Sequence, residues 1–86
     1  MSGDRKNKIT VDIFGQQYTI LGEESPSHIR LVASMVDDKM RDISSMNPKL
    51  DTSKLAVLTA VNAMHDYLKL KDKIDQLELE LKNTKD

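Results

Sequence analysis

The sequence predicts an α+β protein in which an N-terminal β-hairpin packs on an amphipathic helix, followed by a long C-terminal helix that forms a coiled coil. Three observations predict this fold class. Apolar residues alternate along residues 9–13, recur at helical spacing along residues 29–43, and follow an unbroken heptad pattern along residues 56–81. Because a heptad pattern is typical of paired helices, we expect a homodimer or a dimer of dimers.

The composition limits the architecture to one small domain with an extended appendage. The chain has 86 residues, of which only 3% are aromatic, so its core must be thin and aliphatic. We expect a disordered tail over residues 1–7, a head domain over residues 8–65 and a coiled coil over residues 66–86. A second copy of the chain is expected to complete the core.

Charge and cysteine content argue against several function classes. The formal net charge is −1 at pH 7, with both signs interspersed, which argues against strong non-specific binding of nucleic acid. Without cysteine, neither disulfides nor thiolate metal sites are possible. No apolar run is long enough to cross a bilayer and no secretory signal is present, so we expect a cytoplasmic protein without a membrane partner.

The hairpin is predicted from its alternation and from its turn. Gly15-Gln16 fits the two central residues of a type II′ turn. Such a turn implies three cross-strand pairs, which are Phe14–Gln17, Ile13–Tyr18 and Val11–Ile20. The apolar residues that then share one face are Ile9, Val11, Ile13, Tyr18 and Ile20.

The first helix is predicted to start at Ser25 as N-cap, with Pro26 at the first helical position. It runs for about twenty residues, and its apolar stripe packs on the hairpin. The stripe consists of Ile29, Val32, Ala33, Val36, Met40 and Ile43. Pro48 ends this helix because it disfavours helical geometry at the residue before it.

The second helix is predicted to begin after a cap at Asp51 or Thr52 and to run on without proline or glycine for roughly 30 residues or more. Up to Leu68 it is apolar on most of its circumference. We therefore expect one half of that surface to face the hairpin and first helix of the same chain, and the other half to face a partner.

The heptad positions define a seam for self-association. Its a and d residues are Ala56, Ala60, Ala63, Tyr67, Leu70, Ile74, Leu77 and Leu81. In a parallel pair the flanking charges would meet with opposite signs three times, as Asp66–Lys71, Lys73–Glu78 and Glu80–Lys85. The seam therefore favours a parallel, two-stranded arrangement.

The chain offers no catalytic or cofactor-binding motif, so we expect no enzymatic activity, no cofactor, no metal and no small-molecule substrate. Of its two histidines, His65 beside Asp66 allows two interpretations. It is either a metal ligand or pH switch, or an ordinary surface or interface residue. The charged face of the first helix likewise allows two interpretations: it is either a solvated surface or a polar docking surface for a partner protein.

Three segments resemble the ZapA family of bacterial cell-division proteins, in particular its short, Gram-positive type. They are residues 11–20 (VDIFGQQYTI), 29–40 (IRLVASMVDDKM) and 51–62 (DTSKLAVLTAVN), and the resemblance extends from about Lys8 to the end of the chain. It implies a small α+β head with a coiled-coil tail that forms dimers and often tetramers. It also implies a non-enzymatic accessory protein of the cytoplasmic division ring at mid-cell, which binds the tubulin-like GTPase FtsZ and bundles its protofilaments.

The resemblance places the FtsZ contact on charged residues of the head. The candidates in this chain are Arg30, Asp37, Asp38, Lys39, Arg41 and Lys49. Some relatives carry basic residues where this chain has Gln16 and Ser44, which are positions after the hairpin turn and late in the first helix. Two other hypotheses remain at this stage: a nucleic-acid-binding dimer that uses Arg5, Lys6 and Lys8, and a coiled-coil adaptor or chaperone subunit.

Overall fold

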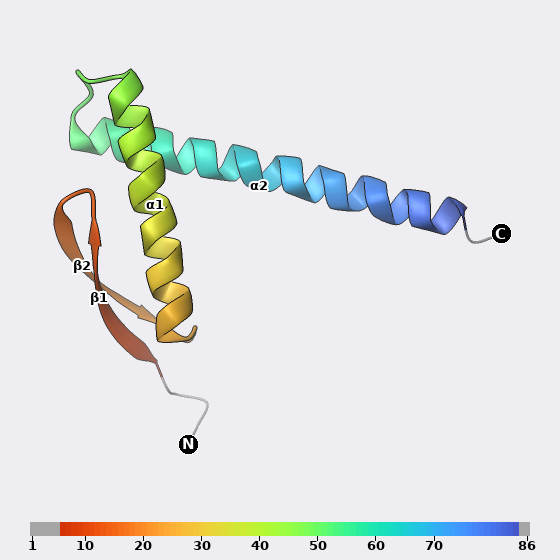
Figure 1. The fold of residues 1–86 in the computed structure, drawn as a ribbon, viewed down its shortest axis with the longest axis horizontal. Coiled ribbons are helices and arrows are strands. Elements are labelled where there is room, and N and C mark those ends of the chain that lie inside the picture. Colours follow the sequence, from red (N-terminus) through yellow and green to blue (C-terminus); the bar gives the residue numbers. More distant parts are fainter. Residues whose placement is uncertain (1–5, 85–86) are drawn as a thin grey trace.

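The computed structural model describes residues 6–84. The elements follow in the order β1 (Asn7–Ile13), β2 (Gln16–Gly22), α1 (Pro26–Met46) and α2 (Thr52–Asn83), and this confirms the predicted fold class. The hairpin lies along one side of α1, while α2 crosses α1 near its C-terminal end and projects far beyond the head (Figure 1). Asn7, which the sequence assigned to the tail, is the first residue of β1.

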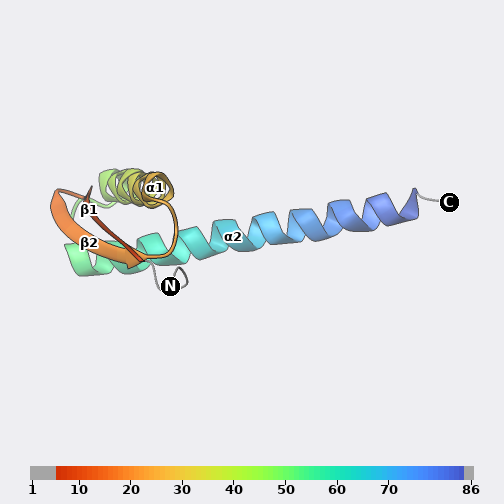
Figure 2. The ribbon, with the colours of Figure 1, turned by 90° about the horizontal axis from the view of Figure 1, so that it is seen from below.

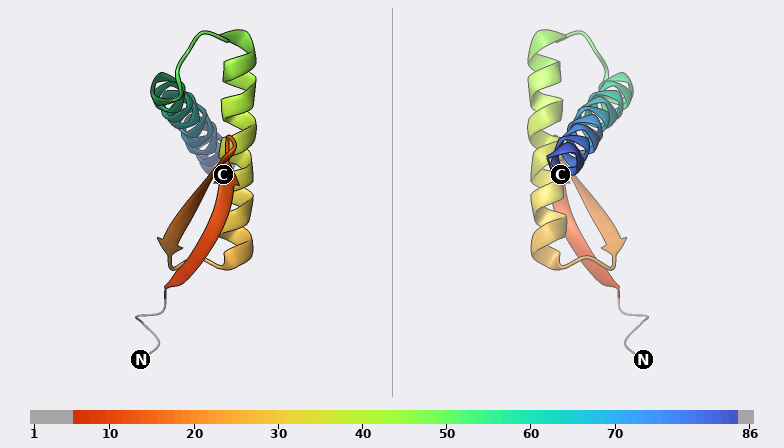
Figure 3. Two further views of the ribbon diagram at one scale, coloured as in Figure 1. Left: turned by 90° about the vertical axis from the view of Figure 1, so that its left-hand side faces the viewer. Right: turned by 90° about the vertical axis from the view of Figure 1, so that its right-hand side faces the viewer.

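The arrangement is thin, with extents of 54 × 46 × 16 Å. Seen from below, α1 and the hairpin lie close to the first turns of α2, and the rest of α2 stands alone (Figure 2). Viewed along α2, β1 lies beside α1 and β2 lies farther from it (Figure 3). The head therefore covers only one end of the long helix.

The predicted hairpin register is wrong by two residues. Val11 pairs with Tyr18 and Ile9 with Ile20, and the two central turn residues are Phe14 and Gly15. Both have positive φ, 50° and 80°, which defines a type I′ turn in place of the expected type II′ turn. Because a shift of two residues preserves the side-chain alternation, the predicted apolar residues still share one face.

Tertiary contacts explain why Phe14 adopts a left-handed conformation that glycine or asparagine would adopt more easily. The N–H of Phe14 donates to Asp37 Oδ1 at 2.7 Å, and the Arg41 guanidinium lies 5.7 Å from the centre of its ring. The ring also packs on a cluster of buried side chains, which are Met40, Ile43 and Leu55. These contacts come from residues far along the chain, so the local sequence around Gly15 could not reveal them.

Helix α1 starts as predicted, because Ser25 Oγ accepts a hydrogen bond of 3.2 Å from the His28 N–H and Pro26 opens the first turn. Its buried residues are Ile29, Ala33, Met40 and Ile43. Val32 was expected in this stripe but is exposed. It lies at the edge of the stripe, where neither the hairpin nor α2 covers it.

Helix α2 begins after Asp51, whose carboxylate accepts a hydrogen bond of 2.9 Å from the Lys54 N–H. Only Leu55 and Thr59 are buried on this helix of 32 residues. The expectation that half of its apolar circumference faces its own head is therefore wrong. The hairpin and α1 are too small to cover more than the first turns, so most apolar residues of α2 remain exposed within the single chain.

We predict that Leu55→Ala lowers the free energy of unfolding by about 2–5 kcal/mol, because Leu55 is the most completely buried large side chain, at 1% exposure. Leu21 on β2 is 62% exposed and gives a matched control, for which Leu→Ala should cost less than about 1 kcal/mol. Urea unfolding at a fixed protein concentration measures both. Equal losses for the two variants would contradict the assigned core.

Candidate functional site

The predicted seam is an exposed apolar stripe along α2. All eight of its residues are exposed in the single chain. The five large ones are between 54% and 70% exposed, and they are Tyr67, Leu70, Ile74, Leu77 and Leu81. A continuous exposed stripe of this kind marks a surface for protein association.

The seam lies beside the side of α2 that α1 covers. Successive residues of an α-helix are rotated by about 100°, which centres the seam roughly 90° around the helix axis from buried Leu55 and roughly 50° from buried Thr59. The seam residues themselves stay exposed beside the head, so a second helix could lie along them. The structure brings the predicted self-association residues together on one face, as the heptads required.

A second apolar stripe lies beside the seam and was not separated from it at the sequence level. Val57, Val61, Met64 and Leu68 are all exposed and follow spacings of four, three and four residues. In the heptad frame they occupy e and b positions, so one partner helix on the seam would leave most of this stripe open. The spacing of these four residues could have predicted a separate stripe, but residues 55–68 are apolar on most sides of the helix, so the stripe did not stand out in the sequence.

An ion pair joins the two helices. Lys39 Nζ lies 2.6 Å from Asp66 Oδ2, and the hydrogen bond from Lys39 holds the pKa of Asp66 below its usual value. Asp66 was expected to face Lys71 of a partner, yet it binds Lys39 of its own chain, and Lys71 lies 3.8 Å from Asp75. Both members of the Lys39–Asp66 pair are partly exposed, so solvent screens it and it contributes modestly to stability.

A second polar cluster ties the hairpin turn to α1. The Asp37 carboxylate accepts hydrogen bonds from Arg41 Nε at 2.9 Å and from the Phe14 N–H at 2.7 Å. The hydrogen bond from Arg41, and then that from Phe14, lower the pKa of Asp37, while Asp37 raises the pKa of Arg41. These two candidates for partner binding therefore also hold the head together.

The six candidate FtsZ-contact residues do not form one patch. Arg30, Asp37 and Arg41 lie within about 40° of one another around α1, on the flank beside β1. Asp38 is close enough to this group to raise the pKa of Arg41. Lys39 lies on the other flank with Asp66, and Lys49 lies in the connection between the helices.

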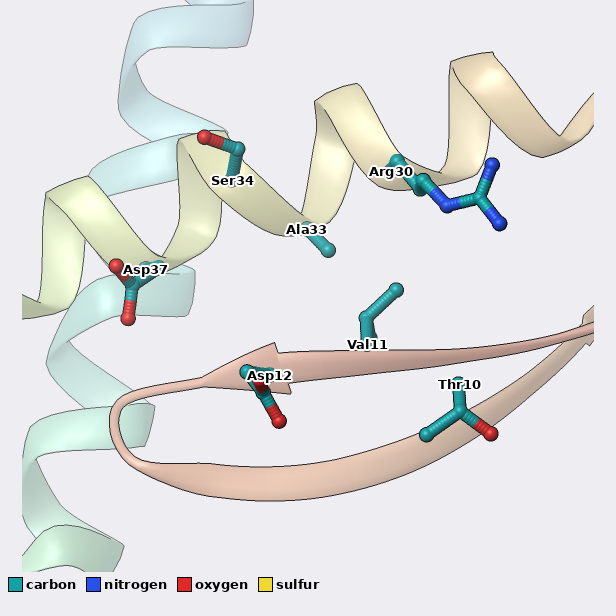
Figure 4. Close-up of a pocket in the computed structure, with 7 residues that line it drawn as sticks. All are labelled: Thr10, Val11, Asp12, Arg30, Ala33, Ser34 and Asp37. Atoms are coloured by element: carbon teal, nitrogen blue, oxygen red, sulfur yellow. The ribbon is translucent and has the colours of Figure 1, made fainter.

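A polar groove runs between β1 and α1 beside this charged flank. It has a volume of about 300 Å³ and is lined by Thr10, Val11, Asp12, Arg30, Ala33, Ser34 and Asp37 (Figure 4). Val11 points toward α1, whereas the Asp12 carboxylate is directed away from it (Figure 4). The groove contains no nucleophile paired with a general base, and its polar groups suit recognition of another polar chain.

The structure also places the other residues that the sequence singled out. His65 is exposed on α2 beside Val61 and Met64. Across residues 6–84, no three histidine or carboxylate side chains are grouped so that they could share a metal ion. Lys6 and Lys8 are exposed, and Arg5 lies outside the described residues. Within the same residues, neither helix has a stretch long and apolar enough to cross a bilayer.

A small α+β head on a projecting helix with an uncovered heptad seam defines a class of self-associating adaptor proteins. Over residues 9–86 the chain matches the family described as "Cell division protein ZapA". It is 64% identical over 86 residues to the cell division protein ZapA of Geobacillus sp. (strain WCH70), covering 100% of this chain and 99% of that protein. It is 61% identical over 82 residues to that of Bacillus subtilis (strain 168), covering 95% and 96%.

Two solved structures are similar to this fold. One is described as a ZapA mutant dimer from Geobacillus stearothermophilus, with a TM-score of 0.74, 54% identity and 95% coverage of each chain. The other is an unknown conserved bacterial protein from Pseudomonas aeruginosa PAO1, with a TM-score of 0.74, 29% identity and coverage of 90% of this chain and 86% of that one. The chain belongs to the ZapA family, whose members are non-enzymatic cell-division proteins that bind and bundle FtsZ.

We predict that Asp66→Asn flattens the acid dependence of stability. The folded-state pKa of Asp66 lies below the ordinary value of 3.8, so ionised Asp66 stabilises the fold above that pH, and this contribution is lost as the pH falls through the lowered pKa. Thermal unfolding between about pH 5 and pH 2 measures the effect. Asp72→Asn, at an exposed position outside the ion pairs of residues 6–84, is the control and should leave the profile unchanged.

Proposed function

We propose that this chain cross-links FtsZ protofilaments, with the head binding the filament and the seam of α2 joining two or more chains. The exposed stripe from Tyr67 to Leu81 carries this proposal, because a cross-linker must present at least two heads and the stripe supplies the means of pairing. The similar chain from Geobacillus stearothermophilus is described as a mutant dimer, which supports pairing of two chains. We place the protein in the cytoplasm at mid-cell, with the division ring.

The contacts between α1 and α2 support the proposed boundary between the head and the coiled coil. The Lys39–Asp66 ion pair is the only ion pair between α1 and α2 among the described residues, and it supports a boundary near residue 66. The head is therefore proposed over residues 8–65, with Asn7 added to it as the first residue of β1, and the coiled coil over residues 66–86. The helix of 32 residues spans about 48 Å. A parallel dimer would carry both heads at one end, whereas a dimer of dimers joined through the tails would carry heads at both ends and bridge filaments directly.

The head contact is proposed to use the charged flank of α1. Arg30 and Asp38 are exposed and form no hydrogen bond or ion pair within residues 6–84, so they are available to a partner. Asp37, Lys39 and Arg41 are engaged with Phe14, with Asp66 and with each other, and we expect their substitution to act partly through head stability. Lys49 lies apart from this flank and is the weakest candidate.

We predict that Leu77→Glu dissociates the protein and abolishes bundling. A charge at a d position must be desolvated in the seam, so self-association should weaken by roughly a hundredfold or more. Analytical ultracentrifugation measures the association, and light scattering with FtsZ measures the bundling.

Leu79→Glu provides the matched control for the seam. Leu79 is 59% exposed and Leu77 54%, and the two lie close together on α2, but Leu79 occupies an f position on the opposite side of the helix. The control should still dimerise. Bundling that persisted in a monomeric Leu77→Glu protein would contradict the cross-linking mechanism, and dissociation by Leu79→Glu would contradict the heptad frame.

We predict that Arg30→Glu combined with Asp38→Lys weakens FtsZ binding by roughly tenfold, about 1.4 kcal/mol, while leaving the dimer intact. The pair of changes leaves the net charge unaltered, so a loss of binding reports local contacts. Asp72→Lys, at an exposed f position of the tail, is the control and should bind normally. Co-sedimentation with polymerised FtsZ gives the affinity, and unchanged binding of the double variant would remove this flank from the contact.

A further inference from the structure

Strand β1 presents an unpaired edge toward the charged flank of α1. In an antiparallel pair, alternate residues direct their backbone N–H and C=O groups toward the partner strand and away from it. With Ile13 and Gln16 flanking the two-residue turn, the pairs Asp12–Gln17 and Thr10–Thr19 are non-hydrogen-bonded, so the backbone groups of these four residues point outward.

The Asp37–Phe14 hydrogen bond shows which side of the hairpin this edge faces. Phe14 lies two residues after Asp12 and four after Thr10, so its backbone N–H points to the same side of the strand as theirs. That N–H donates a hydrogen bond to the Asp37 carboxylate of α1. The remaining outward groups of β1 therefore lie along the groove shared with Ala33, Ser34 and Arg30 (Figure 4). Within residues 6–84, no hydrogen bond joins the backbone of Thr10 or Asp12 to α1.

A strand edge beside a helix is the geometry in which an extended peptide adds to a sheet. The peptide's main chain pairs with the outward backbone groups, and its alternate side chains contact the helix. The opposite edge of the hairpin, at Gln17 and Thr19, lacks such a flank, because α1 packs on β1. The two edges thus offer the same backbone groups in different surroundings.

Charge along the groove indicates what the peptide should carry. At one end, Asp37 is already paired with Arg41. Toward the other end, Arg30 forms no ion pair among residues 6–84, and its guanidinium extends along α1 beside the groove (Figure 4). A carboxylate on the added strand could pair with Arg30 in a charge-assisted, bidentate hydrogen bond.

We propose that the free edge of β1 is a strand-addition site that takes an extended segment of FtsZ, with an acidic side chain of that segment paired to Arg30. This inference rests on the proposed function and deepens it, because it assigns main-chain pairing as the mode of head binding. The segment forms hydrogen bonds with the backbone of Thr10 and Asp12, and the side chains of Ser34 and Arg30 contact its alternate residues.

The direct test is amide hydrogen exchange of the full-length protein with and without polymerised FtsZ, read residue by residue by NMR after quenching. The amides of Thr10 and Asp12 should exchange at least about tenfold more slowly in the bound state, while those of Gln17 and Thr19 should not change. Protection of Thr10 and Asp12 before FtsZ is added would mean that a second copy of the chain occupies the edge, and it would overturn the proposal.

Proline substitution provides a matched pair of variants. Proline is tolerated on a strand edge where the N–H points outward, and it blocks pairing there. Thr10→Pro and Thr19→Pro each remove one outward N–H and the same 3.3 Å hydroxyl contact between the two threonines, but only the first lies on the edge beside α1. Thr10→Pro should weaken FtsZ co-sedimentation by roughly tenfold, and Thr19→Pro should not.

A second variant keeps the test decisive if Thr10→Pro does not fold. Ser34→Trp would fill the groove from the helix side, whereas Ser45→Trp would place the same side chain on an exposed position of α1 outside the groove. Only Ser34→Trp should reduce binding. If FtsZ is bundled normally and neither the groove variants nor the exchange rates respond, strand addition is wrong and the cross-linking function stands; if the unsubstituted protein does not bundle FtsZ, the proposed function itself fails.

Discussion

The uncovered length of α2 is the constraint on which the rest of the structure depends. The hairpin and α1 together bury only Leu55 and Thr59 of this helix, although its apolar residues continue to Leu81. The described residues of the hairpin and α1 leave the heptad stripe exposed. We propose that another chain covers this stripe, so that the number of heads per particle is set by how the stripes pair.

A small head can serve such a helix only if it is held firmly, and polar contacts add to the support that the core clusters give. The two core clusters are small, and Asp37 reinforces the junction between them by binding both the hairpin turn and Arg41. Lys39 then links α1 to Asp66 of α2. Asp37, Lys39 and Arg41 thus have structural roles, whereas Arg30, Asp38 and Asp42 of α1 have exposed side chains that form no hydrogen bond or ion pair among residues 6–84.

Features fixed by local chemistry could be predicted from the sequence. Ser25 and Asp51 cap their helices because their side chains bond nearby N–H groups, and the heptads identify the seam because their spacing needs no tertiary information. The turn at Phe14 could not be predicted, since its left-handed conformation depends on Asp37 and on the core beneath its ring. Two further features depend on the hairpin register and could not be predicted for the same reason. They are the binding of Asp37 to both Phe14 and Arg41, and the outward direction of the backbone groups along the edge of β1.

The head and the seam lie on the same continuous helix, α2, so the position of one depends on the other. Helix α2 is continuous from Thr52 to Asn83, so a partner bound along the seam would fix the direction of the helix on which the head sits. The Lys39–Asp66 ion pair and the packing of Leu55 position α1 relative to α2, and the Asp37–Phe14 hydrogen bond positions the hairpin turn relative to α1. Under the proposed helix pairing, the orientation of the charged flank and of the β1 edge would follow from the seam, and a rigid spacing between heads is what a protein needs if it is to hold neighbouring filaments at a regular distance.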